Sequence, residues 1–207
     1  MPIPSSPALP LPSNPAPDSI WLIPPPNHPI TPLLSRLIST TLLAHFPPPT
    51  HPFPPHITLT SSVPSTLNPS EITSWISTHL SDLPLPEIQF DGVDIGETFF
   101  TRVTLRVTKT PPLQSLATLI RQNFAHSRPD NEDLQVWGEE TYRPHLSLVY
   151  HAMEAKEVEE KLGEVVRMEV EDAGVKEGKG AWKGGRVVVV DCWREIKEWR
   201  VLAEVEL

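Results

Sequence analysis

One short phrase occurs twice in this chain. Residues 55–59 read Pro-His-Ile-Thr-Leu, and residues 144–148 read Pro-His-Leu-Ser-Leu. In both copies polar and apolar residues alternate, which is the pattern of a strand that packs one face against a core. Since residues two apart on a strand share a face, each copy places a histidine beside a hydroxyl residue and turns its aliphatic residues the other way. The phrase therefore predicts two matching strands, one in each half of the chain.

The rest of the chain mixes further strands with helices. Strand-like runs lie at 19–24, 55–61, 87–95, 99–108, 144–150, 168–175, 185–192 and 199–206. The alternation is clear in 99–108, where Val103 and Leu105 share one face and Arg102 and Arg106 share the other. Because helices and hairpins are mixed along the chain, we expect an α+β fold with largely antiparallel sheets.

Four segments have apolar residues at helical spacing. Three begin with a polar residue and a proline, at Thr31-Pro32, Asn68-Pro69 and Thr110-Pro111, and the fourth runs from about 154 to 166. A capping side chain followed by a proline, which has no N–H to leave unpaired, is a favoured helix start. The expected buried stripes are Leu33, Leu34, Leu37, Ile38 and Leu42, then Ile72, Trp75, Ile76, Leu80 and Leu83, then Leu113, Leu116, Ile120 and Phe124, and finally Ala155, Val158, Leu162 and Val165.

Proline is concentrated at the start of the chain. Eighteen of the 26 prolines lie in the first 55 residues, and residues 1–17 alternate proline with small residues. This composition is typical of a disordered or polyproline-like tail. We expect the tail to be solvated or, alternatively, to bind a proline-recognising domain. A chain of 207 residues is within the size of one domain, so we expect residues 18–207 to form a single domain.

The charge balance limits the partners. The net charge of −9 argues against long nucleic acid, whose phosphates require clustered lysine and arginine, but it is compatible with a small phosphorylated ligand.

No apolar stretch is long enough to span a bilayer, and the N-terminus lacks the basic start and apolar run of a secretory signal. The single cysteine, Cys192, excludes an intramolecular disulfide and is expected to be a small buried hydrophobe at a strand end. We expect a monomeric, cytoplasmic protein.

The polar faces of the two motif strands carry a set of groups suited to a phosphate diester. Opening a cyclic phosphate requires a base to activate water and an acid to protonate the leaving oxygen, and imidazole titrates near neutrality. His56 and His145 can fill these two roles. The hydroxyls of Thr58 and Ser147 can donate to the non-bridging oxygens. Nothing in this scheme requires a metal or a cofactor, and we expect neither.

The paired His-x-Thr and His-x-Ser motifs resemble those of the two-histidine (2H) phosphoesterase superfamily. Within it, the chain is similar to fungal and plant cyclic phosphodiesterases over roughly residues 18–207. The resemblance implies a bilobal α+β fold, with two pseudo-twofold-related lobes whose sheets face a central cleft and whose helices lie outside. It implies His56, Thr58, His145 and Ser147 as the catalytic quartet. It also implies that association with the Golgi is possible.

The same resemblance implies the reaction. Members hydrolyse 2′,3′-cyclic nucleotides to nucleoside 2′-phosphates, and ADP-ribose 1″,2″-cyclic phosphate, a by-product of tRNA splicing, to ADP-ribose 1″-phosphate. A small cyclic-phosphate nucleotide is therefore the expected partner. Two alternatives remain open: an RNA end-processing phosphodiesterase, against which the acidic charge weighs, and a non-catalytic nucleotide- or protein-binding module, against which the intact quartet weighs.

Tyr150 and Arg102 are further candidates for substrate contacts. In the family, the counterpart of Tyr150 lines the pocket near the base or ribose. Regular alternation turns Tyr150 away from His145, so its entry into the pocket requires a strand end or a bulge. Arg102 and Arg106 could reach the cleft and hold phosphate, or they could face solvent on the same strand.

Overall fold

The computed structural model describes residues 18–125, 133–175 and 180–207. Residues 1–17, for which a proline-rich tail is predicted, lie outside the described residues. None of the helices in the described ranges combines the length and the apolar character needed to cross a membrane.

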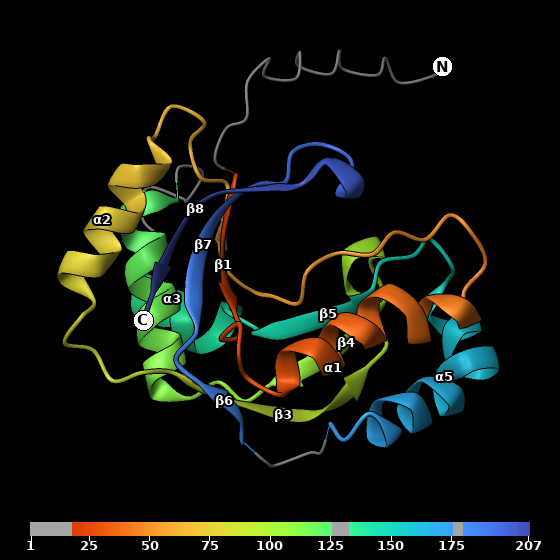
Figure 1. Cartoon of the computed structure of the whole chain (residues 1–207). Helices are drawn as coiled ribbons and strands as arrows, with labels where there is room; N and C mark the ends of the chain where they lie inside the picture. Colours follow the sequence, from red (N-terminus) through yellow and green to blue (C-terminus); the bar gives the residue numbers. More distant parts are fainter. Residues whose placement is uncertain (1–17, 126–132, 176–179) are drawn as a thin grey trace.

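Eight strands form one antiparallel sheet in the order β6-β3-β4-β5-β2-β1-β7-β8 (Figure 1). They are β1 (Ser19–Ile23), β2 (Ile57–Ser61), β3 (Glu87–Asp94), β4 (Val103–Val107), β5 (His145–Val149), β6 (Gly180–Lys183), β7 (Arg186–Asp191) and β8 (Arg200–Glu206). Every strand pair in the sheet is antiparallel. The predictions of an α+β fold and of antiparallel pairing are confirmed.

The two motif strands are neighbours at the centre of this sheet. β2 pairs with β5 at a single position, where Ile57 lies opposite Leu146. Four strands lie on each side of this junction. The two halves of the chain are therefore joined edge to edge in one continuous sheet through the strands that carry the motifs, and the expected two-lobed arrangement about a cleft stays a prediction.

The four predicted helices are present, and they lie beside the sheet (Figure 1). They are α1 (Ile30–Arg36), which continues as the wider turn η1 (Leu37–Thr41) and the 3₁₀ turn η2 (Leu43–His45), α2 (Pro69–His79), α3 (Pro111–Phe124) and α5 (Ala155–Asp172). α2 packs on β7 and β8 and α3 packs on β2, whereas η1 contacts β5 and α5. At α2 the predicted cap is formed, because the Asn68 side chain accepts a hydrogen bond from the Ser70 N–H.

The first helix begins differently from the prediction. α1 starts at Ile30 rather than after Thr31, and the Thr31 hydroxyl donates to the carbonyl of Pro25 at 2.7 Å instead of capping the helix. Leu34 is fully buried, as are the later members of the predicted stripe, but Leu33 is 39% exposed. The helix is therefore rotated so that one predicted core residue faces solvent.

One predicted strand is absent and another begins later than predicted. Residues 168–175 were expected to be extended, but α5 continues to Asp172. The alternation Met-Glu-Val-Glu fits a strand, yet Val166 and Val170, four residues apart, are buried on one side of the helix while Met168 is half exposed. Phe99–Thr101 form a 3₁₀ turn (η3) rather than the start of β4. Strand β6 and the short helical segment α4 (Leu134–Val136) with η4 (Trp137–Thr141) were not predicted.

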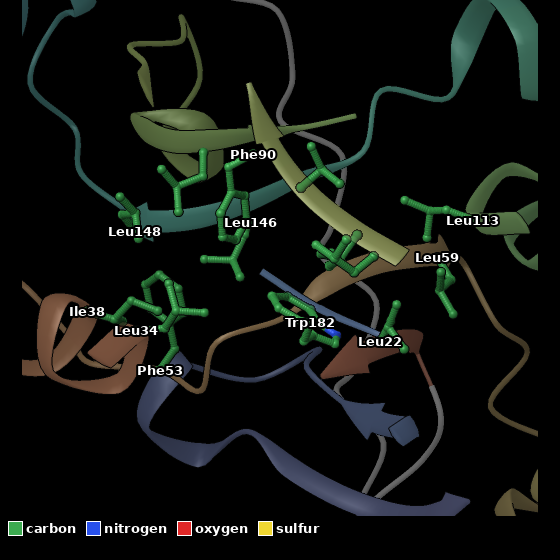
Figure 2. Close-up of a cluster of buried hydrophobic side chains, with 14 of the residues drawn as sticks. Leu22, Leu34, Ile38, Phe53, Leu59, Phe90, Leu113, Leu146, Leu148 and Trp182 are labelled. Atoms are coloured by element: carbon green, nitrogen blue, oxygen red, sulfur yellow. The ribbon is translucent and has the colours of Figure 1, made fainter. Parts of the chain in front are cut away.

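The aliphatic residues of both motifs lie in the core. Ile57, Leu59, Leu146 and Leu148 are fully buried, and Figure 2 shows Leu59, Leu146 and Leu148 among the core side chains. Truncating a leucine in such a position to alanine typically costs about 2–5 kcal/mol, so a one-residue slip of either strand would be strongly unfavourable. The core therefore fixes which face of β2 and β5 the polar motif residues occupy.

Candidate active site

A cavity of about 550 Å³ lies over the polar face of the motif strands. Its walls contain all four polar motif residues and Tyr150, but not Arg102. The lining residues are Asp18, Ser19, Trp21, His56, Thr58, Ser61, Phe100, His145, Ser147, Tyr150, Cys192, Trp193 and Trp199. The structure thus brings five of the six predicted site residues together in one cavity.

The register between β2 and β5 determines how the quartet is arranged. Because Ile57 lies opposite Leu146 in an antiparallel pair, Thr58 lies opposite His145, and His56 lies opposite Ser147. Directly opposed side chains have Cβ atoms about 4.5–5.5 Å apart. Each histidine therefore has two hydroxyl neighbours. One belongs to its own motif and lies two residues along the same strand, and the other belongs to the second motif and lies directly opposite on the neighbouring strand.

A bulge in β5 explains how Tyr150 enters the cavity. Thr104 pairs with Ser147, but its neighbour Val103 pairs with Val149, so Leu148 is an extra residue on β5. An extra residue shifts the alternation of the residues that follow it. The Tyr150 hydroxyl lies 3.4 Å from Nε2 of His56, and its ring stacks on Phe53 with the ring centroids 4.0 Å apart.

Both motif histidines are oriented by the same backbone contact. Nδ1 of His56 donates to the carbonyl of Pro54 at 2.7 Å, and Nδ1 of His145 donates to the carbonyl of Arg143 at 2.9 Å. A carbonyl oxygen can only accept, so Nδ1 carries the hydrogen and Nε2 is the acceptor nitrogen of the neutral ring. A proline stands between donor and acceptor in both copies and restricts the residue before it to an extended backbone. The repeated sequence therefore produces a repeated tautomer.

The two imidazoles nevertheless lie in different environments. His56 is 5% exposed and stacks on Trp21 with the ring centroids 3.8 Å apart and an interplanar angle of 14°. Burial lowers the pKa of His56 to about 4, with a smaller lowering by His145 and an opposing effect of the hydrogen bond to Pro54. His145 is only half-buried. At neutral pH His56 is therefore neutral.

The hydroxyl groups of the site are also held in place. The Ser147 hydroxyl donates to the carbonyl of Phe100 at 3.0 Å. Burial raises the pKa of the Tyr150 phenol, and the side-chain interaction with Ser147 lowers it by less, so the phenol keeps its proton. The hydroxyl of Tyr142 donates to the backbone carbonyl of Thr58 at 3.2 Å and so ties the motif strand β2 to the segment just before β5.

An aromatic wall beside the histidines was not predicted. Trp199 packs edge-on against Trp21 with the ring centroids 5.5 Å apart, and Phe53 lies 5.9 Å from the ring of His56. In the sequence these residues are single aromatic positions in a strand or loop, which usually belong to the core. No local pattern therefore distinguishes them, and only their convergence around His56 marks them as part of the site.

Arg102 lies outside the cavity and is bonded to backbone carbonyls. Its side chain is 3% exposed, and its guanidinium donates to the carbonyls of His151 at 3.3 Å and Glu97 at 3.5 Å. It therefore ties the turn before β4 to the residue after Tyr150, and it neither faces solvent nor lines the site. Arg106 is the arginine that shares a face with His145, since the two lie opposite one another on β4 and β5. Its exposed guanidinium is ion-paired with Asp94 at 3.7 Å.

Within the described ranges, no group of three or more histidine, cysteine, aspartate or glutamate side chains converges as a metal site would require. His151, close to the motif in sequence, uses both ring nitrogens elsewhere. Its Nε2 donates to the carbonyl of Pro47 at 2.8 Å, and its Nδ1 accepts from the N–H of Met153 at 3.0 Å. The cavity itself presents two imidazoles with hydroxyl groups beside them.

Comparison with known proteins agrees with this geometry. The family described as "Cyclic phosphodiesterase-like protein" matches residues 17–207. A protein of Phaeosphaeria nodorum named 2′,3′-cyclic-nucleotide 3′-phosphodiesterase is 33% identical over 195 residues, which are 91% of this chain and 98% of that protein. A Neurospora crassa protein of the same name is 31% identical over 213 residues, covering 90% and 97% of the two chains.

The fold also has a counterpart among solved structures. A crystal structure described as a phosphoesterase superposes with a TM-score of 0.50 at 15% identity and covers 94% of this chain and 99% of its own. This likeness concerns the fold, whereas the match over residues 17–207 and the identity to the fungal proteins concern the family. The resemblance predicted from the repeated motif is confirmed, and the chain belongs to the cyclic phosphodiesterase-like protein family.

Proposed function

We propose that this protein hydrolyses 2′,3′-cyclic nucleotides to nucleoside 2′-phosphates, with the two motif histidines as general base and general acid. The observation that carries the proposal is the convergence of His56 and His145 on one cavity, each with Nδ1 bonded to a backbone carbonyl. The names of the fungal relatives support the same reaction. We extend the proposal to ADP-ribose 1″,2″-cyclic phosphate, which presents the same five-membered cyclic diester and would yield ADP-ribose 1″-phosphate.

The environments of the histidines suggest which is the base. His56 is neutral at pH 7, so Nε2 can accept a proton from a water molecule whose oxygen attacks phosphorus. The bond from phosphorus to O3′ then breaks, and His145 gives its Nε2 proton to O3′. The product is the 2′-phosphate with a free 3′-hydroxyl, and the two histidines have exchanged protonation states. The anionic phosphate bound nearby raises the pKa of His56 and makes it a stronger base in the complex.

Thr58 and Ser147 stabilise the phosphoryl oxygens in this scheme. Each lies opposite the histidine of the other motif, so the two hydroxyls flank the position at which both imidazoles can reach one phosphorus. The Ser147 hydroxyl donates to the Phe100 carbonyl in this structure and would turn to a non-bridging oxygen of the bound diester. Donors aimed at an oxygen that carries charge in the transition state are typically the largest electrostatic contribution to such a reaction.

We also propose that the two halves of the sheet are related by a pseudo-twofold axis between β2 and β5. Neighbouring antiparallel strands are related locally by a twofold axis, and each half has its motif strand innermost with three strands outside it. The matching contacts of the two histidines support this relation. It would account for the position of the cavity at the junction of two lobes.

The pH dependence of the reaction follows from the base. We expect the acid limb of kcat/KM to fall as the pH drops through about 4, because protonated His56 cannot accept a proton. This acid limb, measured for 2′,3′-cyclic AMP, lies below the ordinary histidine range. The unfolded chain binds this proton at the ordinary pKa of 6.5, so stability is also lost as the pH falls from 6.5 to about 4. Circular dichroism at each pH therefore serves as the control, and an acid limb near 6.5 in folded protein would contradict the assignment.

The central experiment is product analysis with the four nucleoside 2′,3′-cyclic phosphates and ADP-ribose 1″,2″-cyclic phosphate. Phosphorus NMR should identify the nucleoside 2′-phosphate, and activity should be unchanged in EDTA. A 3′-phosphate product would contradict cleavage at O3′, and a loss in EDTA that zinc restores would favour a metal site. An oligonucleotide with a cyclic-phosphate end, turned over faster than mononucleotides, would favour RNA end processing. Tight binding without turnover would favour a non-catalytic module.

A further inference from the structure

The cavity that holds the two histidines also holds a carboxylate. Asp18 is the one aspartate or glutamate among the lining residues, and its side chain is half-buried. A carboxylate beside a bound phosphate would repel it, since like charges at close range disfavour one another. Two possibilities follow. Asp18 contacts a part of the substrate other than its phosphate, or it does not contact the substrate at all.

The position of Asp18 along β1 fits the first of these possibilities. Trp21, whose ring stacks on His56, marks the phosphate end of the cavity. Asp18 directly precedes β1 and lies three residues before Trp21, and three residues span about 10 Å at the rise of a strand. This separation is comparable with the length of a nucleoside from its 2′,3′-phosphorus to the hydrogen-bonding edge of its base. A nucleotide that lies along β1 would bring its base to Asp18.

Asp18 is held by two backbone hydrogen bonds and by one contact to its carboxylate. The Asp18 N–H donates to the carbonyl of Val190 at 2.9 Å, and the Asp18 carbonyl accepts from the N–H of Val63 at 3.0 Å. The thiol of Cys192 donates to Oδ2 of Asp18 at 2.9 Å, and burial, with the hydrogen bond to Asp18 as a further cause, raises the pKa of this thiol and keeps it protonated. An ionised carboxylate has about four lone-pair positions, so both oxygens retain capacity for a ligand.

The walls beside Asp18 are aromatic. Trp193 directly follows Cys192, lines the cavity and is 53% exposed, although large aromatic side chains are usually covered. Trp199 also lines the cavity, but nearer the histidines, where its ring packs against Trp21. Stacking on an indole is tolerant of base identity, whereas hydrogen bonds to the Watson–Crick edge are not. This end of the cavity therefore combines a surface on which any base can stack with one group that discriminates among bases.

We propose that Asp18 recognises the nucleobase and gives the protein a preference for guanosine 2′,3′-cyclic phosphate; this inference rests on the proposed function and names its substrate class. An ionised carboxylate only accepts hydrogen bonds. Guanine presents two adjacent donors, N1–H and the N2 amino group, and can bind both carboxylate oxygens. Adenine and cytosine present one amino donor beside a ring-nitrogen acceptor. Uracil presents one N–H between two carbonyl oxygens, and the order of preference is guanine first and uracil last.

The test compares kcat/KM for the four nucleoside 2′,3′-cyclic phosphates in the full chain and in Asp18→Asn. We expect the unsubstituted protein to prefer guanosine over uridine by about tenfold or more, which is the discrimination typical of a bidentate contact with a base. In Asp18→Asn the ratio should fall to about one or below, because the amide replaces one acceptor by a donor, which removes one contact with guanine and matches the N–H and adjacent carbonyl of uracil. Asp82→Asn, an exposed carboxamide substitution outside the cavity, should keep the wild-type ratio.

Trp193→Ala separates stacking from base reading. Loss of a stacking surface should lower kcat/KM for all four nucleotides by a similar factor, on the order of tenfold, and leave the guanosine-to-uridine ratio unchanged. A merely structural role of Asp18 would lower all four rates together, as Trp193→Ala does, so a selective loss of guanosine turnover is the signature of base recognition.

The outcomes distinguish this inference from the proposed function. The role of Asp18 is overturned if the unsubstituted protein hydrolyses the four nucleotides equally well. It is also overturned if Asp18→Asn keeps the guanosine-to-uridine ratio of kcat/KM. Neither result would contradict the phosphodiesterase activity. Turnover of none of them overturns the activity, and base recognition is then measured by calorimetry with guanosine 2′-phosphate and uridine 2′-phosphate. Equal affinities for these two would overturn the inference, and tighter binding of the guanosine compound would support it. The measurements on the unsubstituted protein remain decisive if Asp18→Asn does not fold.

Discussion

Replacing either motif histidine by alanine is expected to lower kcat for 2′,3′-cyclic nucleotides by about 10²–10⁴-fold, the usual contribution of a positioned general acid or base. Both imidazoles line one cavity and direct Nδ1 to a backbone carbonyl, so Nε2 of each is the nitrogen available to the substrate. The two effects should be strongly non-additive in the double variant, because the base and the acid act in one step. Steady-state kinetics with 2′,3′-cyclic AMP measures each of them.

The matched control is His51→Ala. His51 is exposed, lies five residues before His56 and is absent from the cavity lining, so its loss should leave kcat unchanged. His56 is buried and stacked on Trp21, so circular dichroism and thermal unfolding must accompany the kinetics of its alanine variant. If both motif variants are folded and retain more than about a tenth of the wild-type rate, acid–base catalysis by these histidines is contradicted.

A change of leaving group separates the two roles. An aryl phosphodiester releases a phenolate that needs no proton, so it depends on the general base but little on the general acid. With such a substrate His145→Ala should recover much of its loss, whereas His56→Ala should not. The reverse pattern would exchange the roles that burial assigns, since the neutral state of His56 is the reason for making it the base.

The hydroxyl residues are expected to have the next largest effect. Thr58→Val and Ser147→Ala should each lower kcat by about 10²–10³-fold, the loss measured when one donor to a developing oxyanion is removed. The register places each hydroxyl opposite the histidine of the other motif, so both can reach the non-bridging oxygens of a phosphorus held between the imidazoles. Thr78→Val, an exposed substitution on α2, is the control of matched chemistry and should have no effect.

The kinetic parameter that changes decides the interpretation. A fall in kcat with little change in KM indicates donors that act in the transition state, whereas a rise in KM alone indicates uniform binding of the phosphate. The second result would contradict the stated role of Thr58 and Ser147. In Ser147→Ala the carbonyl of Phe100 also loses its donor, so unfolding measurements are needed to separate a local structural cost from a catalytic one.

Local patterns predicted the secondary structure where several signals agreed. At α2 the Asn68 cap, the proline after it and the helical spacing of Ile72 and Ile76 all favour one structure, and the helix forms there. At 168–175 a short alternation of apolar and acidic residues fits a strand and the last turns of a helix equally well. The segment is helical because Val166 and Val170 pack on the core from one side of the helix. This packing involves distant residues, so no local pattern in the sequence could indicate it.

The bulge in β5 illustrates a second limit. The sequence showed that Tyr150 needs an irregular strand to reach the motif face, but it contained no glycine or proline that marks where the irregularity lies. The register of β5 against β4 supplies it at Leu148, because Val103 and Thr104 pair with residues two apart. Arg102 shows the converse: its alternation with Arg106 suggested a shared face, but the 3₁₀ turn before β4 removes Arg102 from the strand and buries it.

The sequence by itself determined which side chains belong together within each motif. Alternation along residues 55–59 and 144–148 assigns His56 and Thr58 to one face and the aliphatics to the other, because the geometry of a single strand depends only on near neighbours. The proline before each histidine likewise acts locally and gives both rings the same backbone contact.

Only the tertiary structure decided how the two motifs meet and how they differ. The pairing of β2 with β5 brings residues from the two halves of the chain side by side in one sheet. Trp21 and Phe53 enclose His56 and lower its pKa, while His145, with the same local sequence, stays half-buried. Burial depends on residues distant in sequence, so two copies of one phrase acquire different environments, and the neutral state of His56 is the reason for proposing it as the base.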